Sequence, residues 1–197
     1  YKINKYKIIL EPFKKNTAPA ILSCALVKEA DYKQPMIFFP ADHLIEKNDK
    51  LIKSIILNSK HLNEDNIFIF GIKPKSPSSQ YGYFLTKNIS KHLKKVTKFI
   101  EKPNLKKAKK IIKQKAYWNS GILFARRDSI INNFKKYQYR NFNLCKQSVN
   151  KSKMSKNVYY LNKNTFIKIH ENSFDYAILE KSRNINAIKL NIPWSDL

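Results

Sequence analysis

The sequence predicts an α/β domain with a mainly parallel central sheet. Short apolar runs rich in Ile, Val, Phe and Tyr alternate along the whole chain with stretches whose apolar residues recur at helical spacing. That alternation is typical of strands joined by crossover helices. The chain has 197 residues, of which 43% are hydrophobic, and no low-complexity linker divides it. We therefore expect one domain over residues 1–197 with a buried core.

Each expected strand is an apolar, β-rich run that ends at a turn residue. Pro40 stops the second run and Gly71 stops the third. In chain order, the expected strands cover residues 7–10, 36–39, 67–70, 81–85, 96–100, 122–125 and 187–190.

The expected helices are recognised by their caps and apolar faces. Asn16 or Thr17 can cap the first helix, and Pro19 fits its first turn. The helices are expected to run from this cap to about residue 30, and then over residues 49–59, 105–115, 129–136 and 174–181. Residues 140–156 are polar enough to predict a mobile surface excursion instead.

The formal net charge of +25 raises nucleic acid or an anionic membrane as a partner, since clustered Lys and Arg bind phosphates. The lysines are scattered, however, and they accompany an excess of Asn, Ile, Tyr and Phe, as an AT-rich coding sequence would favour. We attribute the charge to this bias and expect neither partner. With no apolar run of roughly 20 residues and a polar start, a cytoplasmic protein is the default expectation.

The two cysteines indicate neither a disulfide framework nor a zinc site. Cys24 and Cys145 are far apart in the sequence, and neither has a C-x-x-C partner. We interpret both as reduced structural thiols.

Three short segments carry residues suited to chemistry. Asp42 follows a buried strand directly, where a carboxylate could hold Mg²⁺ or merely cap a helix. Glu101 and Lys102 end another strand, where the lysine could neutralise a phosphate and the glutamate could accept hydrogen bonds from hydroxyls, although an exposed ion pair is the simpler alternative. Asn119 lies between an aromatic pair and a glycine, which suits a sugar pocket or an ordinary turn.

Taken together, these segments and their order resemble the bacterial mannose-1-phosphate guanylyltransferase family of sugar nucleotidyltransferases. N-T-A-P-A, W-N-S-G and D-Y-A-x-x-E-K are specific to this branch, whereas E-K-P alone is weak. The matching segments are residues 9–12, 16–20, 41–43, 70–72, 81–83, 99–103, 118–121, 174–181 and 194–197.

The resemblance implies a Rossmann-like (GT-A-type) nucleotidyltransferase fold, incomplete at both ends. It also implies transfer of GMP from GTP to α-D-mannose 1-phosphate, which yields GDP-mannose and diphosphate for polysaccharide biosynthesis. Mg²⁺ would be the cofactor, and the family leaves a homo-oligomer open. The implied catalytic residues are Asp42, Lys102 and Asp196, with Asp42 and Asp196 as metal ligands. The implied substrate-binding residues are Glu11, Asn16, Thr17, Ala18, Pro19, Tyr81, Gly82, Glu101, Lys102 and Asn119.

The chain also departs from the family pattern. Lys15 stands where the family usually has Arg, and Ser79-Gln80 replaces a Thr-Gly pair. The family's glycine-rich loop, which cradles the triphosphate through backbone N–H groups, is expected before Tyr1. The only glycines are Gly71, Gly82 and Gly121, so no segment of residues 1–197 can replace that loop.

Two further interpretations stay open, and one residue bears on base choice. Another sugar-1-phosphate nucleotidyltransferase is the alternative among enzymes, and a basic nucleic-acid-binding protein is the alternative outside them.

Glu11 ends a strand just before the N-T-A-P segment, where its carboxylate could accept the two adjacent donors of guanine. A solvent-facing Glu before a turn is an equally good interpretation of the sequence.

Overall fold

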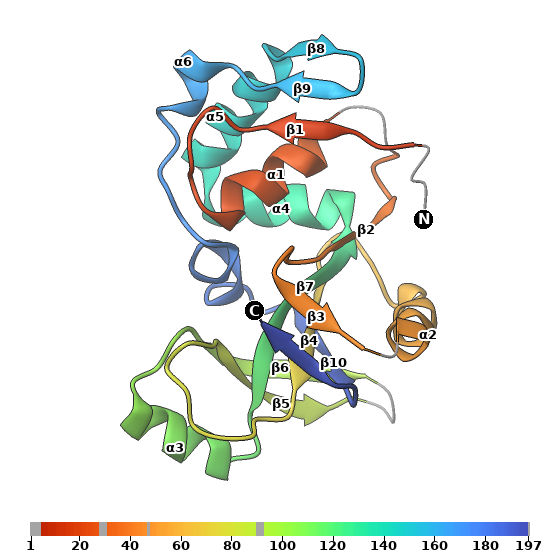
Figure 1. Cartoon of the computed structure of the whole chain (residues 1–197), viewed down its shortest axis with the longest axis vertical. Coiled ribbons are helices and arrows are strands. Elements are labelled where there is room, and N and C mark those ends of the chain that lie inside the picture. The colour runs from red at the N-terminus through yellow and green to blue at the C-terminus, as the bar shows by residue number, and fades with distance from the viewer. Residues whose placement is uncertain (1–4, 28–30, 47, 90–92, 197) are drawn as a thin grey trace.

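The computed structural model describes residues 5–27, 31–46, 48–89 and 93–196, and of residue 196 only the backbone. A central sheet has helices packed on both faces, and a small sheet lies beyond the helices on one side (Figure 1). Among the described residues, no helix combines the length and the hydrophobicity that a membrane crossing needs.

Six strands form the central sheet, and most of them run antiparallel. Their order is β2 (Pro35–Phe38), β7 (Tyr117–Arg126), β4 (Ile67–Ile72), β10 (Ile185–Leu190), β6 (Lys94–Ile100) and β5 (Tyr83–Asn88), and β5 also pairs with β7. Among the described residues of this sheet, only β4 and β10 pair in parallel. The expected α/β class is confirmed, but the expected mainly parallel arrangement is wrong. Apolar runs mark buried strands without giving their direction, and the short β5–β6 connection favours an antiparallel pair.

The remaining elements frame this sheet. Parallel strands β1 (Ile8–Leu10) and β9 (Val158–Tyr160) form a three-stranded sheet with β8 (Lys153–Ser155), and β3 (His43–Ile45) pairs with β11 (Trp194–Asp196). The helices are α1 (Thr17–Leu26), α2 (Asn48–Ser59), α3 (Leu105–Lys113), α4 (Arg127–Tyr137), α5 (Tyr139–Asn150) and α6 (Lys163–Phe166), with a π-helical turn, η1 (Asp175–Leu179).

The sheet is buried on both faces. Every residue of β4 is buried, with Ile67 and Ile69 in one apolar cluster and Phe68 and Phe70 in another. Side chains alternate between the faces of a strand, so β4 joins two cores. The first core contains residues of α1, α4 and α5, and the second contains residues of α2 and α3. This double burial holds the central strands between two packed cores.

Several expected boundaries moved, and one segment was predicted wrongly. The strand expected at 122–125 is the second half of the longer β7, and β4 continues through Gly71. Residues 28–30 of the first expected helix lie outside the described residues. The expected excursion at 140–156 is mostly α5, because Phe142, Cys145 and Val149 recur at helical spacing and are buried.

Both cysteines carry free thiols, as expected from the sequence. Cys145 lies fully buried in the first core, and burial raises the pKa of its thiol to about 12. A buried thiol with so high a pKa packs as a small apolar residue.

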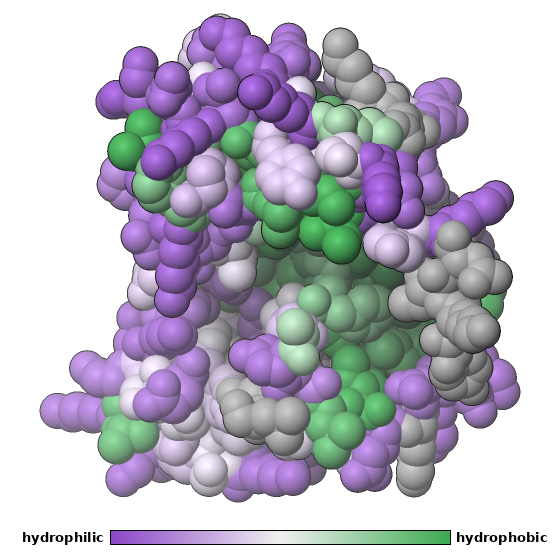
Figure 2. All heavy atoms as spheres, turned by 45° about the horizontal axis from the view of Figure 1, so that its top comes forward, coloured by the Kyte–Doolittle hydropathy of each residue, from purple (hydrophilic) through white to green (hydrophobic). Residues whose placement is uncertain are grey.

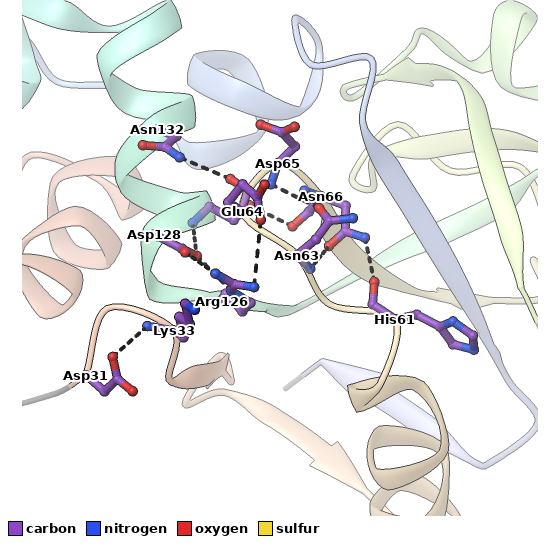
Figure 3. Close-up of polar contacts among 11 residues, drawn as sticks. Asp31, Lys33, His61, Asn63, Glu64, Asp65, Asn66, Arg126, Asp128 and Asn132 are labelled. Carbon is purple, nitrogen blue, oxygen red and sulfur yellow. Dashed lines mark hydrogen bonds and ion pairs between the residues drawn. The ribbon is translucent and has the colours of Figure 1, made fainter.

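A polar network closes the end of the sheet at which β4 begins (Figure 3). The Arg126 guanidinium donates to both carboxylate oxygens of Asp128 and lies 3.8 Å from Glu64 Oε2. The buried Ser129 hydroxyl donates to the Asn66 carbonyl at 2.7 Å. These contacts fasten the loop before β4 to the start of α4. Asn119 lies near the other end of β7, so this network is structural support remote from the site described next.

Candidate functional site

Three residues expected to face a sugar meet at one corner of the sheet. Gly82 precedes β5, Glu101 follows β6, and Asn119 lies near the start of β7. The Asn119 N–H donates to the Gly82 carbonyl at 2.8 Å. A Cβ on Gly82 would lie 2.4 Å from Glu101 Oε2 and 3.5 Å from the Asn119 Cβ. Because glycine has no side chain, the Glu101 carboxyl can lie over the strand beside Asn119.

The Glu101 carboxyl has an electrostatically costly position. Its Oε2 is buried and finds no hydrogen-bond partner in the described part of the chain. Burial is the main cause that raises its pKa from 4.5 to about 7, and the negative charges of Asp175 and Glu180 add to it, against the opposing charge of Lys102. A half-buried carboxyl with a buried, free acceptor atom and a pKa near neutrality is typical of a functional site.

Lys102 stands at the rim of the same corner. It has a backbone φ of 39°, an unusual conformation for a non-glycine residue. Its exposed side chain borders a surface depression together with Asn16, Glu101 and Tyr176. The expected role of Lys102 toward a phosphate stays a prediction, and its exposed position is compatible with it.

Asp42 lies at a second edge, after β2. Its side chain is 72% exposed, and its Oδ1 lies 3.7 Å from Nε2 of His43. The Trp194 indole N–H donates to Nδ1 of His43 at 3.3 Å. A neutral His43 that accepts at Nδ1 carries its proton on Nε2, the nitrogen nearer Asp42. Asp196 lies directly opposite His43 in the β3–β11 pair, so its backbone is next to the residue that follows Asp42.

A row of aromatic rings connects the two edges. Tyr81 packs against Trp118 with ring centroids 4.7 Å apart and against Trp194 at 5.5 Å. Trp194 meets His43 edge to face at 5.2 Å. Tyr81, expected in substrate binding, is therefore a wall residue between the Gly82 corner and the Asp42 edge.

A cavity of about 310 Å³ opens between α1 and the sheet, where Figure 2 shows a hollow with largely apolar walls. Its lining is mostly apolar, but Thr17, Asn119 and Asp175 give it one polar side. Gly121, at φ 73°, also borders it, and a Cβ there would lie 2.9 Å from Pro40. Gly121 thus brings the start of β7 close to the segment that carries Asp42.

The N-T-A-P segment begins α1 as expected, but its residues differ in exposure. Asn16 is the N-cap and accepts from the Thr17 N–H at 2.9 Å, while the Thr17 hydroxyl accepts from the Phe174 N–H at 2.9 Å. Ala18 and Pro19 are buried, and the Ala18 N–H donates to the Asn172 carbonyl at 3.1 Å. In the described structure, only Thr17 of these four residues borders the cavity.

Glu11 lies after β1 and is half-buried rather than turned to solvent. Its Oε1 is buried with no hydrogen-bond partner among the described residues. Burial raises its pKa, and its charge in turn helps raise the pKa of the nearby Cys24, a residue that lines the cavity. The unpartnered oxygen is compatible with the expected hydrogen bonds from Glu11 to a guanine base, which stay a prediction.

The site also contains two acidic residues to which the sequence analysis assigned no role. Asp175 Oδ1 accepts from the Asn119 amide at 2.8 Å, and Glu180 Oε1 accepts from the Glu101 N–H at 3.1 Å. Both lie in the D-Y-A-x-x-E-K segment, which the sequence marked without assigning it a role. They are five positions apart, a spacing that an α-helical reading places on different faces.

The structure thus defines an α/β domain that gathers carboxylates, an amide and a lysine at one side of its sheet, residue types that bind polar ligands. The chain belongs to the Nucleotidyl transferase family, whose sequence profile matches residues 1–197.

Named relatives agree with this membership. The chain is 32% identical over 205 residues to a mannose-1-phosphate guanylyltransferase of Escherichia coli, covering 96% of this chain and 43% of the relative. It is 29% identical over 201 residues to the alginate biosynthesis protein AlgA of Pseudomonas fluorescens, covering 100% of this chain and 42% of the relative. The chain thus spans less than half the length of these relatives.

Solved structures share the fold. A protein described as mannose-6-phosphate isomerase from Helicobacter pylori superposes with a TM-score of 0.87 at 28% identity, covering 95% of this chain and 74% of that one. A protein described as mannose-1-phosphate geranyltransferase from Thermus thermophilus superposes with a TM-score of 0.82 at 20% identity, covering 95% and 53%, which shows the fold alone. The expected nucleotidyltransferase fold is confirmed.

Proposed function

We propose that the full-length protein is a mannose-1-phosphate guanylyltransferase. It would convert GTP and α-D-mannose 1-phosphate to GDP-mannose and diphosphate, in the cytoplasm, for the biosynthesis of polysaccharide. The observation that carries the proposal is the corner of Gly82, Glu101 and Asn119, beside the edge of Asp42 and Asp196. The relatives named guanylyltransferases support the choice of sugar and base.

The Asp42 carboxylate suits a ligand of a magnesium ion. The Asp42 carboxylate is largely exposed, and its partner in the described structure is a histidine 3.7 Å away, so its oxygens can ligate a cation. Asp196 lies on β11, which pairs with β3, the strand that begins directly after Asp42. Mg²⁺ prefers one or two carboxylates together with phosphate oxygens and water. When bound, the ion would neutralise charge that builds on the α-phosphate during the transfer.

The protein residues would act by orientation and charge. In the proposed reaction, a phosphate oxygen of the sugar phosphate attacks the α-phosphorus of GTP. The new P–O bond forms while the bond to the bridging oxygen breaks, and diphosphate leaves. Glu101 would accept from sugar hydroxyls, Asn119 would bind the same ring, and Lys102 would hold the sugar phosphate. Such catalysis consists of positioning and electrostatic stabilisation, without a covalent intermediate.

A diphosphate-release assay with GTP, mannose 1-phosphate and Mg²⁺ tests this proposal in the full-length protein. The wild type should be active, and Asp42→Asn and Asp196→Asn should each reduce kcat by several orders of magnitude with unchanged far-UV circular dichroism. A near-normal rate for either variant removes that aspartate from the metal site.

Two substrate controls sharpen the assay. Replacing GTP by ATP or UTP tests the base, and a preference for either overturns the guanylyltransferase assignment. Residues 1–197 on their own should show no significant turnover, because they contain no glycine-rich loop for the triphosphate. Robust turnover by them alone would contradict our placement of the phosphate site.

A further inference from the structure

The π-helical turn η1 and its C-cap residue, Glu180, present two acids on one side. The Glu180 N–H donates to the Asp175 carbonyl at 2.9 Å, which closes a turn between residues five apart. A single π turn is rare and is found frequently at functional sites. Here it aims both side chains at the Gly82 corner. In an α-helix, residues five apart would lie on different faces.

Asp175 fixes the orientation of the Asn119 side chain. Its Oδ1 accepts from Asn119 Nδ2 at 2.8 Å. An amide has chemically different ends, and this bond holds the NH₂ end toward Asp175. The Asn119 Oδ1 is left with a long contact of 3.4 Å to the Gly121 N–H, so it keeps capacity to accept from a ligand hydroxyl.

Glu180 holds the backbone next to the Glu101 carboxyl. Its Oε1 accepts from the Glu101 N–H at 3.1 Å. The following residue, Lys102, has a φ of 39°. A non-glycine residue in that region costs about 1 kcal/mol or more and persists only where its surroundings hold it. The Glu180 contact supplies such a hold from a different element.

We propose that Asp175 and Glu180 are positioning residues for the sugar, which hold the Asn119 amide and the Glu101 backbone in the geometry that binds it. This inference rests on the proposed function. We define the two contacts together as the η1 clamp. The clamp is costly for the fold, because its two contacts bring the carboxyls of Asp175 and Glu180 to the corner that already holds Glu101. Burial raises the pKa of Glu101 and that of Asp175. Packing alone would favour neutral side chains there.

Kinetics of the full-length protein test the clamp. Asp175→Ala and Glu180→Ala should each raise KM for mannose 1-phosphate about 10-fold to 100-fold, because misplacement by about 1 Å can cost 100-fold, while KM for GTP stays within about twofold. Asp175→Asn and Glu180→Gln keep an acceptor oxygen and should recover most of the loss. Lys181→Ala, an exposed neighbour on the same segment, is the matched control and should behave as wild type.

Amide hydrogen exchange of Glu101 gives a readout that does not need activity. Glu180→Ala should speed exchange of this N–H at least about 10-fold, and Glu180→Gln should not. An unchanged sugar-phosphate KM in both alanine variants, or unchanged exchange in Glu180→Ala, overturns the clamp. A wild type that uses glucose 1-phosphate instead of mannose 1-phosphate would refute the proposed function, and the variants would then test the clamp with that substrate.

Discussion

Glu101→Gln should stabilise the protein at alkaline pH while it impairs sugar binding. The folded state holds the pKa of Glu101 near 7, against an ordinary value of 4.5, so the folded protein binds the proton more tightly than the unfolded chain. Stability is therefore lost as pH rises from about 4.5 to about 7 and is level above that. Glutamine has no proton to lose and should remove this contribution to the pH dependence.

The size of the effect follows from the pKa. A difference of about 2.5 pKa units corresponds to about 3.4 kcal/mol at 1.36 kcal/mol per unit. Glu101 is only half-buried, and solvent screening reduces this to about 1–2 kcal/mol. Urea unfolding followed by circular dichroism should show Glu101→Gln more stable than wild type by this amount at pH 8, relative to their difference at pH 4.

The control variant is Glu46→Gln, which changes an exposed glutamate on the loop after β3. Its side chain is exposed, so it should not reproduce the gain in stability of Glu101→Gln between pH 4 and pH 8. If Glu101→Gln behaves like Glu46→Gln, the Glu101 carboxyl is not held in a costly position and the argument from its burial fails. Asp175 contributes with the same sign, because burial raises its pKa also, so a residual slope should remain in Glu101→Gln.

Three further variants follow from single contacts. Gly82→Ala places a Cβ 2.4 Å from Glu101 Oε2 and should displace that carboxyl. Steady-state kinetics of the full-length enzyme should then show KM for the sugar phosphate raised about 10-fold or more, with little change in Tm. An unchanged KM would mean that the carboxyl can move aside without loss of sugar binding. Glu11→Gln should weaken use of GTP far more than use of ITP, which lacks the guanine amino group, and equal losses would assign Glu11 to the fold. Ser129→Ala leaves the Asn66 carbonyl without its 2.7 Å donor. The free energy of unfolding in urea should fall by about 1–3 kcal/mol, while kcat/KM stays normal. A large loss of activity would contradict the remote, structural role of that network.

Local patterns in the sequence predicted the elements well where one interaction dominates. The N-cap Asn16 and the buried run of β4 follow from local chemistry, and both are present. Strand direction depends on which distant partner is available, so the antiparallel course of β7 was not predictable. The prediction for residues 140–156 failed for a related reason. Polar residues dominate the composition of this segment, and the few buried residues around Phe142 were too sparse to outweigh them.

The candidate site was predicted through its residue types and not through its contacts. Gly82, Glu101 and Asn119 are 37 positions apart at most, and the pairing of β5 with β6 and β7 brings them together. The link from His43 to Trp194 joins residues 151 positions apart, which no local pattern records. Glu180 was missed because its role depends on a π turn, and sequence periodicity does not distinguish that turn from an α-helix.

The charge of the whole chain and the charge of the corner together favour one orientation of a bound sugar phosphate. The chain as a whole carries a formal charge of +25, which attracts GTP and sugar phosphates alike. The corner itself has three carboxyls, Glu101, Asp175 and Glu180, and this local field repels a phosphate. The neutral hydroxyl end of a sugar phosphate can enter the corner and donate to these acceptors, while its phosphate stays outside near Lys102. Under the proposed function, charge alone therefore favours the orientation in which the sugar hydroxyls enter the corner and the phosphate stays at Lys102, and it disfavours the opposite orientation.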